Sequence, residues 1–183
     1  MTFPVKGLNA ETGREPEELL ARIRELFGEG AVVDVRAHTA GLKEEVQYRD
    51  IWLSVDKGRF LEMIDVLAEF DFPMFYVMSG NDDGDVVTLY YHFGIFQCAG
   101  RGKRFGVAVS VALPKNDLVV PSLFSRIPGV EYSEREMREM LGITFDGLPN
   151  TALVFLPEDW DEAVKPWRRD ETGPKPENVR ELS

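Results

Sequence analysis

Residues 86–113 read VVTLYYHFGIFQCAGRGKRFGVAVSVAL, and this stretch decides the fold. Two long runs rich in β-branched and aromatic residues, Val86–Gln97 and Phe105–Leu113, predict two strands. The glycine-rich segment between them, Ala99–Lys103, predicts a hairpin turn, because glycine adopts a positive φ without steric cost. We therefore expect an antiparallel pair of strands, with the rest of a sheet built around it.

The preceding sequence supplies helices and further strands for this pair. Leu19, Ile23 and Phe27 recur at helical spacing after Pro16, which suits the first turn of a helix. Asp56 is expected to cap a second helix. The helices are expected at Glu15–Gly28 and Lys57–Phe70, and the strands at Ala31–Ala37, Val46–Val55 and Met74–Met78. This order predicts an α+β fold, in which a mixed or antiparallel sheet has helices packed on it.

The segment from Ser133 to Gly142 predicts a short helix that follows the sheet. Ser133 and Glu136 stand at the spacing of a capping box, in which each side chain bonds the backbone N–H of the other residue. Glu134 in the first turn complements the positive end of the helix dipole. Gly142 suits the left-handed residue that ends a helix. A further short helix is expected at Pro121–Ile127.

The chain changes character after residue 156. Residues 157–183 contain four prolines and no sustained hydrophobic period, so we expect an extended C-terminal arm, with residues 1–156 forming the domain. Two of the three tryptophans, Trp160 and Trp167, lie in this arm. Either they pack back on the domain, or they anchor the arm on another protein, for which the adjacent Arg168 and Arg169 are suitable.

The charge balance restricts the partners of the chain. Among 183 residues, 21 are basic and 32 acidic, a formal net charge of -11. This disfavours nucleic-acid binding and attachment to anionic lipid, which both need clustered Lys and Arg. No apolar run approaches the roughly 20 residues of a membrane-spanning helix, and the start of the sequence lacks a signal-peptide core. We therefore expect a cytoplasmic protein without direct membrane insertion.

Cysteine and histidine are too few for a self-contained redox or zinc site. Cys98 is the one cysteine, which excludes an internal disulfide, and the two histidines, His38 and His92, lie far apart. We interpret His92 as a packed or hydrogen-bonded strand residue. The basic segment Gly100–Gly106 is interpreted as a hairpin turn, because a strand and not a helix follows it. No catalytic, cofactor-binding or metal-binding residue is predicted.

The stretch Pro121–Pro149, PSLFSRIPGVEYSEREMREMLGITFDGLP, resembles the signature of the thirty-kilodalton subunit family of respiratory complex I. That family includes the equivalent subunits of energy-converting membrane-bound NiFe hydrogenases. Its pattern is an E-R-E helix, then G-I, an aromatic residue and G-H-P, and the matching residues here are Glu134, Arg135, Glu136, Gly142, Ile143, Phe145, Gly147 and Pro149. Residues 166–170, PWRRD, resemble the P-L-R-K-D motif of the family's tail.

Three departures from the pattern indicate which branch the chain resembles most. Leu148 replaces the family's His, and Glu139 replaces an Asp in the helix. Residues 150–153, NTAL, lack the Arg that is usual in the complex I branch. These differences favour the hydrogenase-like or sulfur-reductase-like branches over the quinone-reducing one.

The resemblance implies a subunit without a redox centre of its own. It would bind and organise the large catalytic subunit in the cytoplasmic arm of a membrane-bound energy-converting oxidoreductase of the hydrogenase, sulfur-reductase or NADH dehydrogenase type. It would then lie on the cytoplasmic face of the membrane through that complex. The other implied partners are a small cluster-bearing subunit and a ferredoxin-like subunit, and the iron–sulfur clusters and a NiFe centre would belong to the partner subunits.

The implied partner-binding residues lie in the E-R-E helix, the loop after it and the arm. They are Glu134, Arg135, Glu136, Arg138, Gly142, Phe145, Gly147, Pro149, Trp160, Trp167, Arg168, Arg169 and Asp170. Two alternatives belong to other classes. One is a stand-alone α+β enzyme that uses His92 and nearby carboxylates, and the other is a free-standing binding module whose arm docks elsewhere.

Overall fold

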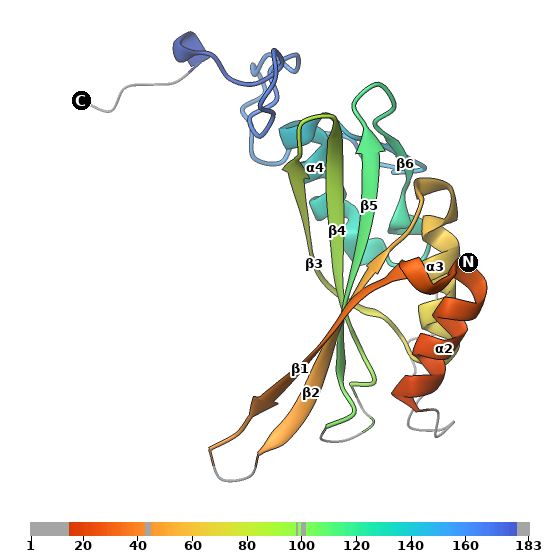
Figure 1. Ribbon diagram of the computed structural model, residues 1–183. Coiled ribbons are helices and arrows are strands. Elements are labelled where there is room, and N and C mark those ends of the chain that lie inside the picture. Colours follow the sequence, from red (N-terminus) through yellow and green to blue (C-terminus); the bar gives the residue numbers. More distant parts are fainter. Residues whose placement is uncertain (1–14, 43–44, 98, 100–101, 179–183) are drawn as a thin grey trace.

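A five-stranded mixed sheet with helices on one face forms the body of the protein (Figure 1). The computed structural model describes residues 15–42, 45–97, 99 and 102–178. The helices are α2 (Pro16–Phe27), α3 (Phe60–Phe70) and α4 (Glu131–Leu141). The strands are β1 (Val32–Ala40), β2 (Val46–Ser54), β3 (Met74–Asp82), β4 (Val86–Ile95), β5 (Phe105–Pro114), β6 (Val119–Pro121) and β7 (Thr144–Asp146).

The predicted antiparallel pair lies in the middle of the sheet. The strand order is β1-β2-β5-β4-β3. Strands β4 and β5 pair antiparallel along their whole length, from Val86 opposite Pro114 to Ile95 opposite Phe105. Strand β2 runs parallel to β5, and the β1–β2 and β3–β4 pairs are antiparallel. The prediction of an α+β fold with a mixed sheet is therefore confirmed.

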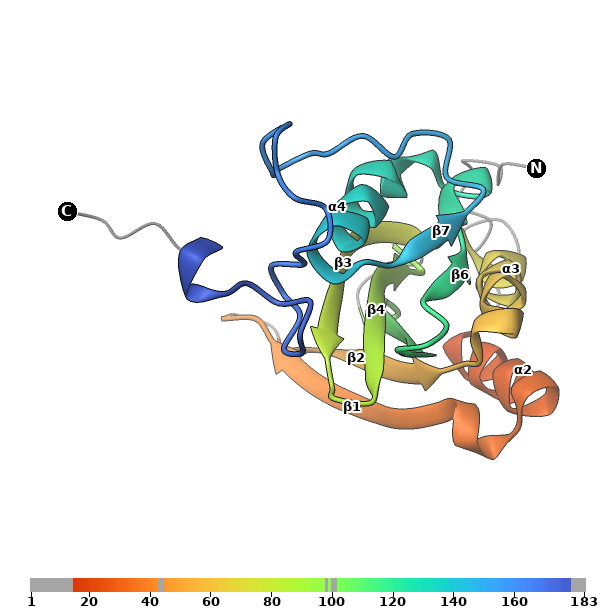
Figure 2. The same ribbon diagram turned by 90° about the horizontal axis from the view of Figure 1, so that it is seen from above.

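The core lies between the sheet and the helices, which all cover the same face (Figure 2). Alternate residues of β4 point into this core, and Tyr91 among them packs on Phe60 of α3, with 4.4 Å between the ring centroids. Leu19 and Ile23 of α2 are fully buried, as the helical spacing predicts. Burying one large apolar side chain contributes about 1.5–3 kcal/mol to stability, and this is the main force that holds the helices on the sheet.

The helix ends differ in how well the sequence predicts them. Helix α2 begins with Pro16 and ends at Gly28, whose φ is 86°, as expected. The predicted start of the second helix at Lys57 is wrong, because a 3-10 turn over Lys57–Arg59 precedes α3. Asp56 stands before this turn but makes no side-chain capping bond. Lys57 instead donates to the carbonyl of Asp117, 3.3 Å away, so this turn is tied to the β5–β6 connection.

Two further predictions need correction. The strand expected at Met74–Met78 continues to Asp82, because Asn81 and Asp82 still pair with β4. The helix expected at Pro121–Ile127 does not form. Strand β6 ends there and two 3-10 turns, Leu123–Ser125 and Pro128–Val130, follow it. The predicted hairpin turn at 99–103 extends outside the described residues.

Strands β6 and β7 form a small parallel pair that the sequence does not predict. Val120 lies opposite Phe145, and both side chains are buried in the core. This pair joins the segment before α4 to the segment after it, so that α4 is held at both ends beside the edge strand β3.

Candidate functional site

Helix α4 lies against β3 and carries the whole E-R-E motif, residues 134–136. Its inner side is packed closely: a Cβ placed on Gly80 of β3 would lie 2.5 Å from Leu141 Cδ1 and 2.9 Å from Met137 Sδ. The helix ends at Gly142, whose φ of 77° is left-handed and whose N–H donates to the carbonyl of Arg138 at 3.0 Å. The predicted C-terminal stop is confirmed.

The predicted capping box at the start of α4 is wrong. The helix begins two residues earlier, at Glu131, and Val130 stands at its N-cap without a side-chain bond. The 3-10 turn Pro128–Val130 leads directly into the helix, so Ser133 lies inside the first turn instead of before it. Glu134 does lie in the first turn, as predicted, but its carboxylate has another use.

The Glu134 carboxyl group is fully buried and binds the segment before the helix. Its two oxygens accept hydrogen bonds from Ser122 Oγ at 2.5 Å and from the N–H of Leu123 at 2.7 Å. Burial raises its pKa to about 7, and the two hydrogen bonds only partly oppose that shift. Among the described residues no Lys or Arg forms an ion pair with it. Burial, and then the Glu134 charge, also raise the pKa of Tyr91.

Arg135 and Glu139, one helical turn apart, bind the backbone of residues 152–155. Arg135 donates from Nε to the carbonyl of Ala152 at 2.8 Å and from Nη2 to that of Leu153 at 3.1 Å. Glu139 accepts from the N–H groups of Val154 and Phe155, both at 2.8 Å. Both side chains are buried. Two buried charges of α4 therefore satisfy four peptide groups that belong to no strand or helix.

The C-terminal end of α4 is capped by the arm. The N–H of Trp167 donates to the carbonyl of Met140 at 3.0 Å, and Arg168 Nη1 donates to that of Leu141 at 3.2 Å. The aliphatic stem of Lys165 covers Gly142. Carbonyls at a helix C-terminus have no partner within the helix, so the arm supplies the donors that α4 lacks.

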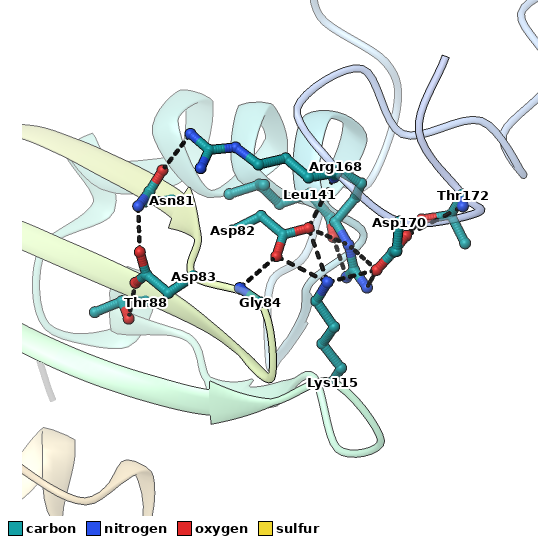
Figure 3. A network of polar contacts seen from close by, with 11 residues as sticks. Asn81, Asp82, Asp83, Gly84, Thr88, Lys115, Leu141, Arg168, Asp170 and Thr172 are labelled. Carbon is teal, nitrogen blue, oxygen red and sulfur yellow. Dashed lines mark hydrogen bonds and ion pairs between the residues drawn. The ribbon is translucent and has the colours of Figure 1, made fainter. Parts of the chain in front are cut away.

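A second set of contacts ties the arm to the turn between β3 and β4 (Figure 3). We call Asp82, Lys115, Arg168 and Asp170 the arm network. Lys115 Nζ lies 2.8 Å from Asp82 Oδ1 and 2.7 Å from Asp170 Oδ2, and Arg168 contacts both carboxylates. The N–H of Arg169 donates to Asp82 Oδ2 at 2.8 Å. The network therefore joins β3, the end of β5 and the arm.

The two carboxylates of the arm network remain ionised. Burial acts to raise the pKa of Asp82, but hydrogen bonds from Lys115 and from the N–H groups of Arg169 and Gly84 outweigh it and lower that pKa. The hydrogen bond from Lys115, followed by those from Thr172 and Arg168, holds the pKa of Asp170 far below its usual value. Both groups are thus charged at neutral pH and attract the two cations between them.

The remaining residues of the predicted set divide into buried and exposed groups. Phe145 is buried in the core, whereas Gly147 and Pro149 are exposed beyond β7. Glu136 is half-buried, and Arg138 pairs with Glu162 of the arm at 3.1 Å. Trp160 donates from Nε1 to the carbonyl of Val164 at 3.0 Å, and Trp167 keeps 43% of its surface exposed. The exposed Arg169 reaches Asn81 at 3.5 Å.

Sequence inspection missed three residues of this site, Glu139, Asp82 and Lys115. Glu139 stands four residues after Arg135, a spacing that places both on one helix side, so the pair is visible in the sequence. Asp82 lies in the polar run 81–85, NDDGD, whose composition indicates a turn in contact with solvent. Its partner Arg169 is 87 residues away, and no local pattern indicates that contact.

One comparison identifies the family. The model of the respiratory-chain NADH dehydrogenase 30 Kd subunit family matches residues 53–177, more than half of the chain. The chain belongs to this family. The membrane-bound hydrogenase subunit beta of Pyrococcus furiosus is 28% identical over 90% of this chain and 90% of its own. The formate hydrogenlyase subunit 5 of Escherichia coli is 31% identical over 51% of this chain and 16% of its own.

A solved structure of the same fold belongs to an archaeal respiratory membrane complex, the membrane-bound sulfane sulfur reductase. Its chain is 17% identical, has a TM-score of 0.60, and the match covers 83% of this chain and 82% of that one. The matched family region, 53–177, contains α4 and nearly all of the described arm. The site described above therefore lies within the region that defines the family.

The alternative of a stand-alone enzyme depends on His92. His92 is half-buried, lies 3.4 Å from Ser79 Oγ and meets Trp52 edge to face, and no described carboxylate pairs with it. Burial lowers its pKa. The described residues contain no group of three or more His, Cys, Asp or Glu that could hold a metal ion. None of the described helices has the length and apolar character needed to cross a bilayer.

Proposed function

We propose that this protein is a cofactor-free subunit that binds and organises the large catalytic subunit of a membrane-bound oxidoreductase complex. The observation that carries the proposal is the way α4 holds residues 152–155. Buried Arg135 and Glu139 bind the peptide groups of this segment, while Phe155 keeps 63% of its surface exposed. The fold thus fixes an extended segment and directs a large apolar side chain outward.

Two more aromatic side chains of the same region support a docking surface. Tyr132 of α4 is 66% exposed. The guanidinium carbon of Arg135 lies over its ring, at a distance of 5.2 Å from the centroid. Trp167 of the arm is 43% exposed although its backbone is fixed on α4. Aromatic residues with ordered backbones are typical anchors of protein interfaces. We call Tyr132, Phe155 and Trp167 the arm surface.

The relatives favour a partner that is a larger subunit. In the Escherichia coli relative, the matching part makes up 16% of the chain. One polypeptide there joins a region like this one to a much longer remainder. In our proposal the two regions are separate chains, and contact through the arm surface takes the place of the covalent connection.

The other parts of the proposal follow from this role. Buried Glu134 holds the segment before α4, and buried Arg135 holds residues 152–153. Trp167, Arg169 and Pro149 are exposed, so another chain can reach them. The partner subunits, including a small cluster-bearing subunit and a ferredoxin-like one, would carry the iron–sulfur clusters and a NiFe centre. The complex would hold this chain at the cytoplasmic face of the membrane.

Co-purification of the native complex tests the proposal. The double variant Phe155→Ser/Trp167→Ser removes two anchors of the arm surface but no group that fixes the arm. We expect it to fold and to lose the large subunit during affinity purification. The matched control is Val33→Ser, because Val33 on β1 is also 63% exposed but lies far from the arm in sequence. Normal assembly of the double variant would falsify the proposal.

A further inference from the structure

The outer face of the sheet, opposite the helices, is not used by the proposed function. Helices α2, α3 and α4 all lie on the other face (Figure 2), and no described helix covers the outer one. The register places Trp52 of β2 beside Ala108 of β5, and Ala108 beside His92 of β4. The small Ala108 side chain thus lies between two large rings on this face.

Paired glycines deepen the same part of the face. Gly94 of β4 lies opposite Gly106 of β5. A Cβ on Gly94 would collide with the hydroxyl of Tyr76, and a Cβ on Gly106 would collide with the carboxylate of Asp50. Because these two glycines have no side chains, the Tyr76 hydroxyl from β3 and the Asp50 carboxylate from β2 can lie close to the backbone of the outer face.

These residues enclose a hollow of about 220 Å³. Its walls are Asp50 and Trp52 from β2, Tyr76 from β3 and His92 from β4, and its floor is β5 from Gly106 to Ala108. Trp52 and His92 meet edge to face, with 6.3 Å between their centroids. Aromatic rings with a carboxylate beside them are a typical receptor for an ammonium or guanidinium group.

Two charged or titratable groups of β1 border the hollow. Arg36 lies over the Trp52 ring at 5.4 Å, so this ring binds a guanidinium, and Asp34 at 2.6 Å neutralises the Arg36 charge. His38 Nε2 lies 3.0 Å from Asp50 Oδ2 at the rim. Burial lowers the pKa of His92, so that ring is neutral at pH 7 and does not repel a cation. The net charge of -11 attracts a basic partner in general.

We propose that the hollow receives a lysine or arginine side chain from a neighbouring subunit, held by the rings of Trp52 and Tyr76 and neutralised by Asp50. This surface is a second contact on the face opposite the core. It rests on the proposed function only in requiring that the chain works in a complex. The partner segment is defined by its chemistry: one basic side chain inserted into the hollow from a segment lying across the outer face.

Photo-cross-linking in the purified native complex tests this contact. Val77 is 52% exposed and lies opposite His92 on the outer face, so p-benzoylphenylalanine at this position reports on the hollow without removing a wall. We expect a cross-link to another subunit, in a peptide with Lys or Arg within a few residues of the linked site. A cross-link within the chain or to a second copy of it, a linked peptide without a basic residue, or no cross-link would each overturn the inference.

Two variants connect the cross-link to the hollow. Asp50→Asn removes the carboxylate charge, and Gly106→Ala keeps every charge and ring but displaces Asp50. We expect both to reduce the yield several-fold, whereas the control Asp85→Asn, which removes the same charge at an exposed residue outside the hollow, should not. An equal effect of all three variants would contradict the inference. If the arm-surface variants abolish assembly and Val77 still finds no other subunit, only this inference fails.

Discussion

Glu134 is a carboxyl group without an ion-pair partner among the described residues, and its burial has a measurable consequence. Its pKa rises from 4.5 to about 7 on folding. The folded state therefore binds more protons than the unfolded state between these values, and stability falls as pH rises through this window. We expect the loss between pH 5 and pH 8 to approach about 3 kcal/mol.

The variant Glu134→Gln isolates this effect. Its amide keeps an oxygen for the N–H of Leu123 and gains donors for Ser122 Oγ. Urea unfolding gives the free energy of unfolding of both proteins at pH 5 and pH 8. The difference between the two pH values should be smaller in the variant than in the wild type. The lowered pKa of His92 acts with the opposite sign, but it is common to both proteins. Identical pH slopes in the two proteins would show that Glu134 does not titrate in this range.

Glu139 is expected to control the order of the segment it binds. It accepts two backbone hydrogen bonds, from Val154 and Phe155, and a bond to a charged group contributes about 1.5–3 kcal/mol. In Glu139→Ala the two amides should exchange with deuterium at least tenfold faster, while exchange in β4 and β5 stays unchanged. Glu136→Ala is the control, because Glu136 is half-buried on the same helix. Unchanged protection of both amides would refute this role.

At the scale of elements, the arm network determines whether the arm stays on the domain. In Asp82→Asn the cations Lys115 and Arg168 lose a buried counter-charge, which is costly unless they reach water. We expect the arm to detach instead of the domain unfolding. Limited proteolysis should therefore cleave within residues 157–178 much faster, with little change in the melting temperature.

The exposed neighbour Asp85 provides the matched control for this variant. The backbone carbonyl of Asp85 accepts a hydrogen bond from the N–H of Lys115 at 3.2 Å. Asp85→Asn removes the side-chain charge but keeps this backbone hydrogen bond. The wild type adds a pH test of the same network. Because the pKa values of Asp82 and Asp170 are lowered on folding, their contribution is complete above their unfolded value and is lost as the pH falls below it. Arm cleavage that is equally fast in both variants would contradict the role of Asp82.

The sequence predicts elements where the controlling interactions are local. The runs of β-branched and aromatic residues in β4 and β5 and the glycines at 28 and 142 are such cases. The capping box failed because a 3-10 turn upstream, not Ser133, starts the helix. The parallel β2–β5 pair and the contact of Asp82 with the arm join distant segments, and neither hydrophobic period nor turn chemistry contains that information.

At the scale of the whole molecule, the sheet separates two surfaces with different chemistry. The arm surface consists of exposed aromatic side chains from α4, from residues 152–155 and from the C-terminal arm. Buried charges of α4 hold the backbone of residues 152–155. The hollow on the outer face is aromatic and acidic, and small residues in β5 shape it. If both proposed contacts form, the chain touches two neighbours at once, as the proposed organising role requires.

Removal of the arm tests how the molecule is divided. The buried apolar core ends at Leu148, and no described residue of the arm belongs to it. A chain that stops at residue 156 should therefore still unfold in one cooperative transition, because Lys115 and Asp82 remain paired with each other at 2.8 Å. We expect a melting temperature lower by roughly 2–8 °C. In the cell this chain should not co-purify with the large subunit. The same loss is expected when the truncation is combined with Arg135→Glu, which also frees residues 152–153. A non-cooperative melt would show instead that the arm is part of the folding unit, and normal assembly would show that the docking surface lies elsewhere.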